Sequence, residues 1–234
     1  MLRTLQHFGF EWDGPVVRQQ DRNQDYEKAL DTLRSNRLIF ACACSRAQLE
    51  DDLAYPGNCR NRAIAPGPQT ALRLRIDAGH IQFTDRIQGI FRQDVAAAIG
   101  DIILKRRDQL FAYVLAVVVD DAEQGVNHVL RGADLLDNTP RQIYLQRLLG
   151  YARPAYAHVP VLTEADGSKL AKSRRSVNLS EGSPLPQLLS VFSLLGLAPP
   201  LSIRSATVAE LWTWAISQWR IENVPKCLAL RVND

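Results

Sequence analysis

The sequence predicts an α/β fold in which buried strands alternate with amphipathic helices, followed by a helical C-terminal part. Two apolar segments, residues 110–119 and 126–130, indicate core strands, because each is far shorter than the roughly 20 residues that a membrane helix needs. Helix signals agree between Thr139, predicted as the N-cap, Pro140 as the first helical residue and Gly150 as the end. Strands and helices in this alternation indicate an α/β protein.

The composition limits the kind of protein. The chain has 234 residues, enough to bury a core in one large domain or two small ones. A hydrophobic content of 46% and a charged content of 23% are ordinary for a globular protein. The formal net charge of +3 excludes a global basic field, so any contact with RNA must depend on local patches. No secretory signal pattern is found, and we expect a cytoplasmic protein, with a monomer as the expected state.

The first 41 residues are predicted to form two helices and a short strand. Apolar residues at positions 2, 5 and 8 recur at helical spacing, and Gly9 ends the pattern. A second amphipathic helix starts near Tyr26 and ends near residue 36, and residues 38–41 form a strand that leads to a pair of cysteines. Because the chain begins inside a helix with no preceding strand, we expect that a segment has been lost before residue 1.

The next segment is predicted to be largely irregular. Ser45 and Gln48 have the spacing of a capping box, so residues 46–53 are expected to form a short helix. Residues 56–68 contain three prolines and two glycines and are expected to form a loop.

An antiparallel region is predicted after this loop. Apolar residues at positions 72, 74 and 76 alternate with Arg73 and Arg75, which is typical of a half-buried strand. Residues 81–83 and 87–91 are expected to continue the antiparallel region. Beyond residue 185, the spacing of apolar residues predicts helices.

Three cysteines within residues 42–59 indicate a metal site. Cys42, Cys44 and Cys59 flank a proline-rich loop with few apolar residues of its own, and thiolates are strong ligands of zinc. The alternative is three buried thiols that act as small apolar residues, but the loop favours metal. A tetrahedral structural site needs a fourth donor, and the candidates are Tyr55, Asp51, Asp52 or a water molecule. Cys227 lies far away in sequence and is expected to be an inert thiol.

A cationic segment follows the turn at residues 166–167. Residues 169–175 hold four positive charges and no carboxylate, after a strand-like stretch at residues 158–162. Lysine side chains on such a loop can neutralise charge on a phosphoryl group as the loop closes. The alternative is an ordinary solvated surface.

Together these segments resemble a known family. Residues 112–121, 125–136 and 139–142 resemble the catalytic core of class I glutamyl-tRNA synthetases, and residues 169–173 (Lys-Leu-Ala-Lys-Ser) look like the KMSKS signature of that family. The Cys-Cys-Tyr-Cys arrangement is similar to that of the short paralogues, the glutamyl-Q tRNA(Asp) synthetases, which lack an anticodon-binding domain. The resemblance extends from residue 1 to beyond residue 200.

The resemblance implies a fold and a domain organisation. We expect a Rossmann-like class I synthetase core, N-terminally truncated, with a zinc-bearing insertion and a helical C-terminal part. The expected domains are residues 1–41 and 100–175 for the partial core, 42–99 for the zinc-bearing insertion with antiparallel strands, and 176–234 for the helical region.

The resemblance also implies site residues. Tyr113 would line a glutamate pocket, and Arg131, at the carboxyl end of a strand, would pair with a substrate carboxylate through a bidentate fork. Lys172 would be the catalytic residue that contacts ATP, and Lys169 would support ATP binding on the same loop. The zinc ligands would be Cys42, Cys44, Tyr55 and Cys59. No role is assigned to His128 or His158.

The implied reaction is ATP-dependent activation of glutamate, with Mg²⁺ shielding the phosphates, and transfer to queuosine of tRNA(Asp), which is a tRNA modification. Two departures stand out: Ala171 replaces the family's serine, and the HIGH-type motif, expected before residue 1, is missing. Two alternatives follow: a catalytically incompetent remnant that binds zinc and RNA, and a catalytic-domain fragment of a glutamyl-tRNA synthetase.

Overall fold

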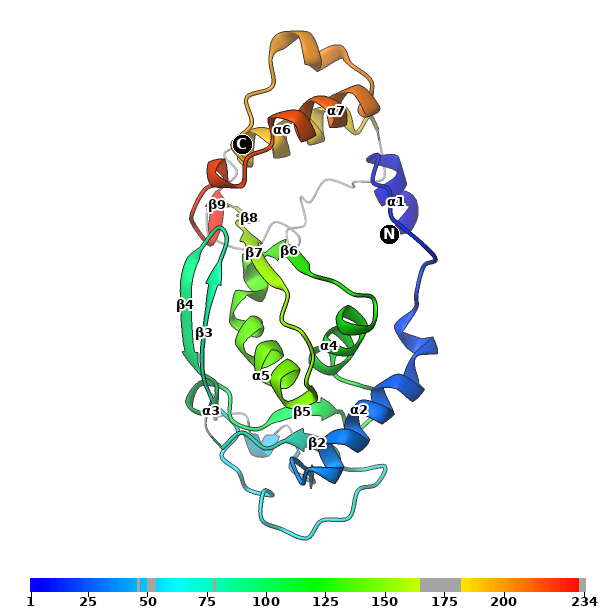
Figure 1. Ribbon diagram of the computed structural model, residues 1–234, viewed down its shortest axis with the longest axis vertical. Coiled ribbons are helices and arrows are strands. Elements are labelled where there is room, and N and C mark those ends of the chain that lie inside the picture. The colour runs from blue at the N-terminus through cyan, green and yellow to red at the C-terminus, as the bar shows by residue number, and fades with distance from the viewer. Residues whose placement is uncertain (46, 50–53, 78, 165–181, 232–234) are drawn as a thin grey trace.

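The structure is a computed structural model that describes residues 1–45, 47–49, 54–77, 79–164 and 182–231 (Figure 1). It is an α/β protein. Its helices are α1 (Leu2–His7), α2 (Asn23–Ser35), α3 (Val95–Ala98), α4 (Tyr113–Glu123), α5 (Thr139–Leu149), α6 (Leu185–Leu194) and α7 (Val208–Gln218). Its strands are β1 (Ile39–Cys42), β2 (Ala71–Leu74), β3 (His80–Asp85), β4 (Gly89–Asp94), β5 (Ile102–Lys105), β6 (His128–Gly132), β7 (Ala155–Val159), β8 (Val161–Thr163) and β9 (Ala229–Arg231). None of the described helices is long and apolar enough to span a membrane.

The strands form four small sheets. β1, β2 and β5 make an antiparallel sheet in that order, and β3 and β4 make an antiparallel hairpin. β6 and β7 are parallel, with Arg131 opposite His158, and β8 is parallel to β9 near the end of the chain. A parallel pair places two carboxyl ends at one edge, where open α/β sheets bind ligands.

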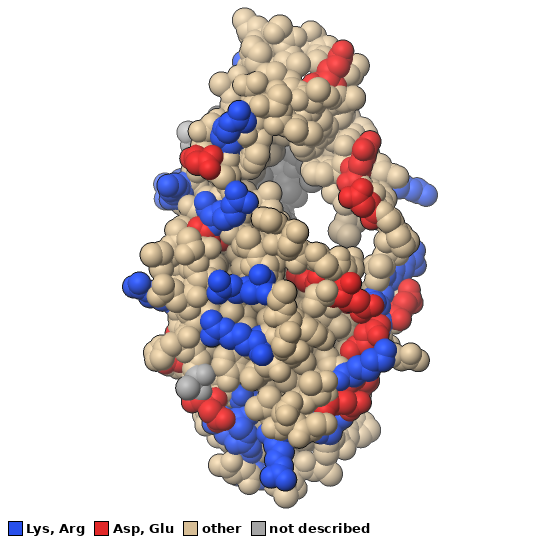
Figure 2. Space-filling model, in the orientation of Figure 1, with Lys and Arg blue, Asp and Glu red and all other residues tan. Residues whose placement is uncertain are grey.

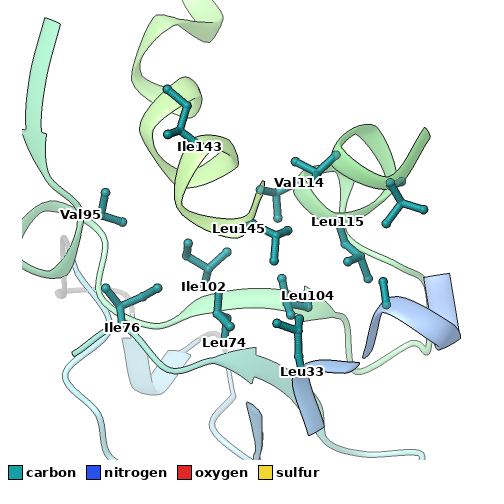
Figure 3. Packing of buried hydrophobic residues seen from close by; sticks show 14 of the residues in the cluster. Leu33, Leu74, Ile76, Val95, Ile102, Leu104, Val114, Leu115, Ile143 and Leu145 are labelled. Carbon is teal, nitrogen blue, oxygen red and sulfur yellow. The ribbon is translucent and has the colours of Figure 1, made fainter. Parts of the chain in front are cut away.

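The main hydrophobic core lies between the β1–β2–β5 sheet and helices α2, α4 and α5 (Figure 3). Leu74, Ile102 and Leu104 of the sheet point towards Leu115 of α4 and Leu145 of α5, and all five side chains are buried. Burial of this kind stabilises the fold by about 1.5–3 kcal/mol for each large aliphatic side chain. The core therefore fixes α4 and α5 relative to the sheet.

A second apolar cluster joins the two ends of the chain. Phe8 of α1 packs with Phe192 of α6 and Leu211 of α7, and the indole of Trp212 donates a 2.8 Å hydrogen bond to the carbonyl oxygen of Phe8. Gly9 has a φ of +78°, which a residue with a side chain rarely adopts. The glycine ends α1 as the sequence predicts.

Residues 110–119 do not form the predicted strand, which is a correction to the sequence analysis. The structure places Tyr113–Glu123 in helix α4, which buries Val114, Leu115 and Val118. A helix that is buried on most of its surface shows no polar face, so its apolar run looks like a core strand. The valines also favour strands by intrinsic preference, and tertiary packing overrides that preference.

Two smaller differences concern burial and capping. Arg73 is only 7% exposed, so β2 is buried on both faces instead of half-buried. Helix α5 begins at Thr139 itself, with Asn138 as its N-cap, and it ends at Gly150 as predicted. The predicted capping box is present, because the Ser45 amide donates to the Gln48 side chain and the Gln48 amide donates to the Ser45 hydroxyl. Gln48 itself lies in a 3₁₀ turn, η2 (Ala47–Leu49).

Charges are mixed over the face seen in Figure 2, and acidic side chains gather on the side of α2. This distribution agrees with the small net charge, since no single basic face covers the visible surface. Asp120, nearly buried in α4, links the two helices by accepting hydrogen bonds from Arg22 and from the hydroxyl of Tyr26 in α2.

Candidate functional site

Three cysteines converge where strand β1 ends. The Sγ atoms of Cys42, Cys44 and Cys59 all lie within 4.8 Å of one another, and the distance between Cys44 and Cys59 is 3.5 Å. None of the three is in a disulfide. β1 delivers Cys42, and a turn after the proline-containing segment delivers Cys59. The cluster can therefore present three soft donors to a single ion.

The hydroxyl of Tyr55 lies beside these thiols. Among the described residues, Tyr55 is the one predicted candidate for a fourth ligand. Its hydroxyl lies 3.4 Å from Sγ of Cys42 and 4.0 Å from Sγ of Cys44, and it accepts a 2.9 Å hydrogen bond from the Cys59 amide. Asp51 and Asp52, the other protein candidates, lie outside the described residues. The geometry thus places the Tyr55 hydroxyl beside the three thiols.

Two features hold Tyr55 in place. Its amide donates to the carbonyl of Ile99, and Gly100 lies so close that a Cβ there would be 2.5 Å from the Tyr55 carbonyl oxygen. On the ring face, the guanidinium of Arg73 stacks 3.8 Å from the centroid. The phenol is therefore positioned by the backbone on one side and by a cation on the other.

The protonation of the cluster differs between its members. Burial raises the pKa of the Cys44 thiol to about 11, and hydrogen bonds with Cys59 and Cys42 add to the effect. Burial also opposes ionisation of Cys59, but hydrogen bonds from the Ala43 backbone and from Cys44, Tyr55 and Cys42 outweigh it and lower the pKa to about 7. One thiol is therefore ready to ionise near neutral pH. Three thiols at these distances fit the donor chemistry of a zinc site, whereas burial raises the pKa of the neighbouring Tyr55 phenol and so favours its protonated form.

The second group of polar residues surrounds Arg131, at the carboxyl end of β6. Its Nε donates to Nε2 of His158 at 3.0 Å, across the parallel β6–β7 pair. Nδ1 of His158 lies 2.6 Å from the carboxylate of Asp85, which ends β3. Because an arginine Nε can only donate, Nε2 of His158 must accept, so the imidazole is neutral and its proton is on Nδ1.

The other nitrogens of Arg131 have different roles. Nη2 donates to the hydroxyl of Thr139 and to Oε1 of Gln142, both at 2.8 Å. Within the described residues Nη1 makes no hydrogen bond. The predicted bidentate fork is therefore not fully available, and Nη1 is the nitrogen that remains to meet a ligand.

The carboxylate of Asp85 is buried but well satisfied. It accepts hydrogen bonds from the amides of Ile87, Gln88 and His158 in addition to the imidazole. Burial opposes its ionisation, but the bonds from His158 and these amides prevail, so the pKa of Asp85 lies below its ordinary value. Asp85 therefore stays charged and fixes the tautomer of His158.

Sequence reasoning assigned no role to His158 and did not single out Asp85, Thr139 or Gln142 as partners of Arg131. His158 is fully buried within an apolar strand, where the pattern alone gives no reason to select it. The register of the parallel pair reveals it, and that register is a property of the fold.

The remaining predicted residues are placed as follows. Tyr113 is the first residue of α4, 50% exposed, and lines a cavity of about 380 Å³. Arg131 is not among the described residues that line this cavity. Lys169 and Lys172 lie outside the described residues.

Comparisons with known proteins place these groups in context. The family model for the catalytic domain of class I tRNA synthetases (E and Q) matches residues 1–200. The chain is 46% identical over 231 residues to the glutamyl-Q tRNA(Asp) synthetase of Pseudomonas fluorescens, with 98% of this chain and 77% of that protein covered. It is 48% identical over 231 residues to the protein of the same name from Ectopseudomonas mendocina, with 98% and 78% covered.

Solved structures agree on the fold. The crystal structure of a glutamate-tRNA synthetase from Elizabethkingia anophelis matches 99% of this chain with a TM-score of 0.75 and 20% identity. A glutamate tRNA ligase from Elizabethkingia meningosepticum matches 98% of the chain with a TM-score of 0.73 and 19% identity. The chain spans 57% and 55% of those two proteins. At this identity the likeness concerns the fold alone.

Proposed function

The chain belongs to the class I tRNA synthetase family (E and Q), and within it to the glutamyl-Q tRNA(Asp) synthetases, and from that premise we propose that it activates glutamate with ATP and transfers the glutamyl group to tRNA(Asp). The observation that carries this proposal is identity to relatives of that name over almost the whole chain. The acceptor would be a hydroxyl of queuosine, so the product is a modified tRNA. The protein is thus an ATP-dependent ligase of the glutamyl-tRNA-synthetase type.

In the proposed mechanism, Arg131 binds a carboxylate of glutamate. Its Nε and Nη2 are held by His158, Thr139 and Gln142, so the guanidinium needs no reordering when the substrate arrives. Nη1 then donates to the carboxylate. Tyr113, half exposed at the start of α4, would line a further part of the glutamate pocket, since Arg131 is not among the described residues around the cavity that Tyr113 lines.

The chemistry begins with attack of a glutamate carboxylate oxygen on the α-phosphorus of ATP. The bond to the bridging oxygen breaks, pyrophosphate leaves, and glutamyl-adenylate remains. Lys172, supported by Lys169, would stabilise the charge on the phosphoryl group. Mg²⁺, when bound with ATP, shields the phosphates. The acceptor hydroxyl then attacks the glutamyl carbonyl and AMP leaves.

A zinc ion is proposed as a structural cofactor. Cys42, Cys44, Tyr55 and Cys59 would hold it, and the convergence of their donor atoms supports this ligand set. Zinc in a closed four-ligand site stabilises a segment that has little apolar core. We propose the domain division of the sequence analysis, with residues 42–99 as the zinc-bearing insertion, and a monomeric protein in the cytoplasm.

Glutamate-dependent exchange between ATP and pyrophosphate tests the first step, because it requires no RNA. Exchange is expected with glutamate and not with glutamine or aspartate. Transfer of labelled glutamate is then measured with tRNA(Asp) that contains queuosine and with the same tRNA that contains guanosine at that position. Labelling of the queuosine form alone supports the proposal. Attachment to the 3′ end of a glutamate tRNA would contradict it.

A further inference from the structure

Tyr55 belongs both to the cysteine cluster and to the cavity that Tyr113 lines. Its hydroxyl lies 3.4 Å from Sγ of Cys42 and accepts a 2.9 Å hydrogen bond from the Cys59 amide. The same residue contributes to the lining of the cavity of about 380 Å³ at the start of α4. The proposed metal site and this part of the proposed glutamate pocket are therefore adjacent, because one residue borders both.

Arg73 of β2 also borders both sites. It lines the cavity that Tyr113 lines, and it lines a neighbouring cavity of about 460 Å³ together with Cys42 and Cys44. Arg73 is buried, and its guanidinium lies 3.8 Å from the centroid of the Tyr55 ring. Because a planar guanidinium stacks on an aromatic ring in a preferred orientation, Arg73 restricts the position of that ring.

Asp101 connects Arg73 to the segment that carries Cys59. The carbonyl oxygen of Asp101 accepts a 2.7 Å hydrogen bond from Nη1 of Arg73. Its buried carboxylate accepts hydrogen bonds from Nε and Nη2 of Arg60, at 3.1 and 2.6 Å, and Arg60 directly follows Cys59. A further hydrogen bond comes from the Ile76 amide at 2.9 Å. Asp101 therefore holds β2 and the turn at Cys59 together.

Tyr55, Arg73 and Asp101 form one connected set of residues, which we call the shared wall. All three line the cavity at the start of α4. At both ends the shared wall reaches Cys59, because Asp101 is bonded to Arg60 and the Tyr55 hydroxyl is bonded to the Cys59 amide. A metal ion bound by the cysteines would hold Cys59 in place and so hold both ends of the wall. A wall that one ligand has already ordered costs less free energy to order when a second ligand binds.

We propose that the shared wall couples the metal site to the glutamate pocket, so that metal binding at the cysteines raises the affinity for glutamate, with Arg73 as the positioning residue. This inference rests on the proposed function and adds to it a dependence of substrate binding on metal occupancy. Linkage requires the converse effect, so bound glutamate must raise the affinity for zinc by the same factor. We expect a factor of about ten, which is within the usual range of such couplings.

Two titrations of the full chain test the coupling without ATP or RNA. Calorimetry measures the affinity for glutamate on the zinc-loaded chain and on the chain from which a chelator has removed the metal. Competition with a chromogenic chelator measures the affinity for zinc with and without saturating glutamate. The zinc-loaded chain is expected to bind glutamate about tenfold more tightly, and glutamate is expected to raise the zinc affinity by the same ratio.

Arg73→Lys tests whether the effect depends on the shared wall. Lysine keeps the positive charge but lacks the planar group that stacks on Tyr55 and the fork that reaches the Asp101 carbonyl. In this variant the ratio of the two glutamate affinities is expected to fall below about two, because the coupling is lost. Arg92→Lys, at an exposed position of β4, is the matched control and should keep the full ratio. Thermal denaturation of both zinc-loaded variants checks that they are folded.

Three results would overturn the coupling. The first is a native chain that binds glutamate equally well with and without zinc. The second is an Arg73→Lys variant that keeps the full ratio, because a dependence caused by general unfolding of the metal-free chain would persist in that variant. The third is an equal loss of the ratio in Arg73→Lys and Arg92→Lys. Failure of the proposed function gives a different result: the zinc-loaded native chain then binds no glutamate at all, which overturns both proposals.

Discussion

Arg131 and His158 face each other across the parallel strands β6 and β7, with Nε and Nε2 3.0 Å apart. The hydrogen bond has a defined direction, because the imidazole is held as a neutral acceptor by Asp85 behind it. Three charged or polar groups from three strands thus form one chain that ends at Nη1 of Arg131, which has no hydrogen-bond partner in the described part of the protein. The buried Asp85 and His158 therefore position Arg131 for the proposed carboxylate site.

Loss of the imidazole should destabilise the protein. His158→Ala removes the imidazole partner of both the Asp85 carboxylate and Nε of Arg131 and leaves Asp85 only its backbone donors, so we expect the free energy of unfolding to fall by about 2–4 kcal/mol. Denaturation with urea measures it. His128→Ala, on the same sheet but exposed, is the control and should change the value by less than about 0.5 kcal/mol. A similar loss in both variants would show that the Asp85–His158–Arg131 network does not contribute to the free energy of unfolding.

The charge of Asp85 predicts a dependence of stability on pH. Its pKa in the folded protein is depressed, so the stabilisation is fully present above the unfolded value of about 3.9 and is lost as the pH falls through the lower folded value. The difference in unfolding free energy between the native protein and Asp85→Asn should be largest at neutral pH and narrow below about pH 4. The exposed Asp137→Asn should show no such trend. If the difference in unfolding free energy between the native protein and Asp85→Asn does not change with pH, the depressed pKa of Asp85 is contradicted.

Removal of zinc should unfold the insertion first. Elemental analysis is expected to give one zinc per chain, and a chelator should lower the melting temperature. Cys59→Ser should lose most of the metal, whereas Cys227→Ser, outside the cluster, should retain it. Zinc affinity should decrease below pH 7, because protonation of Cys59 competes with the metal, and binding should release protons from Cys44 at neutral pH. Metal retention in Cys59→Ser would remove this residue from the ligand set.

Gly100 should matter for the metal site although it supplies no ligand. Gly100→Ala combines a φ of +70° with a Cβ only 2.5 Å from the Tyr55 carbonyl oxygen, so the backbone at Tyr55 or at residue 100 must shift. Gly57→Ala is the matched control, since its φ is +86° but nothing lies within 4 Å. Both should lose about 1 kcal/mol for the backbone conformation. Only Gly100→Ala is expected to lose zinc affinity as well, as measured by competition with a chromogenic chelator.

Much of the fold could be predicted from local patterns, and the exceptions have physical reasons. The ends of α5 and the capping box at Ser45 depend on residues close in sequence, and the structure confirms them within one residue. Helix α4 was mistaken for a strand because its burial, which is a tertiary property, removes the polar face that identifies a helix. Arg73 was expected at the surface because its partner, the ring of Tyr55, comes from a different part of the chain.

The candidate site divides in the same way. The cysteines lie near one another in sequence, so their spacing was sufficient to select them. His158 and Asp85 are separated by 73 positions and meet through the packing of β3 against β7. The residue pattern within one segment cannot predict a contact between side chains so far apart in sequence.

Strand β9 stabilises β8 although the two strands are far apart in sequence. Val161, Leu162 and Thr163 lie beside Ala229, Leu230 and Arg231, and the amide of Val161 donates to the carbonyl of Leu228. The lysine-rich signature follows β8 in the sequence, so β9 pairs with the last described strand before that signature. Substitutions in residues 229–231 are therefore expected to disturb β8 as well.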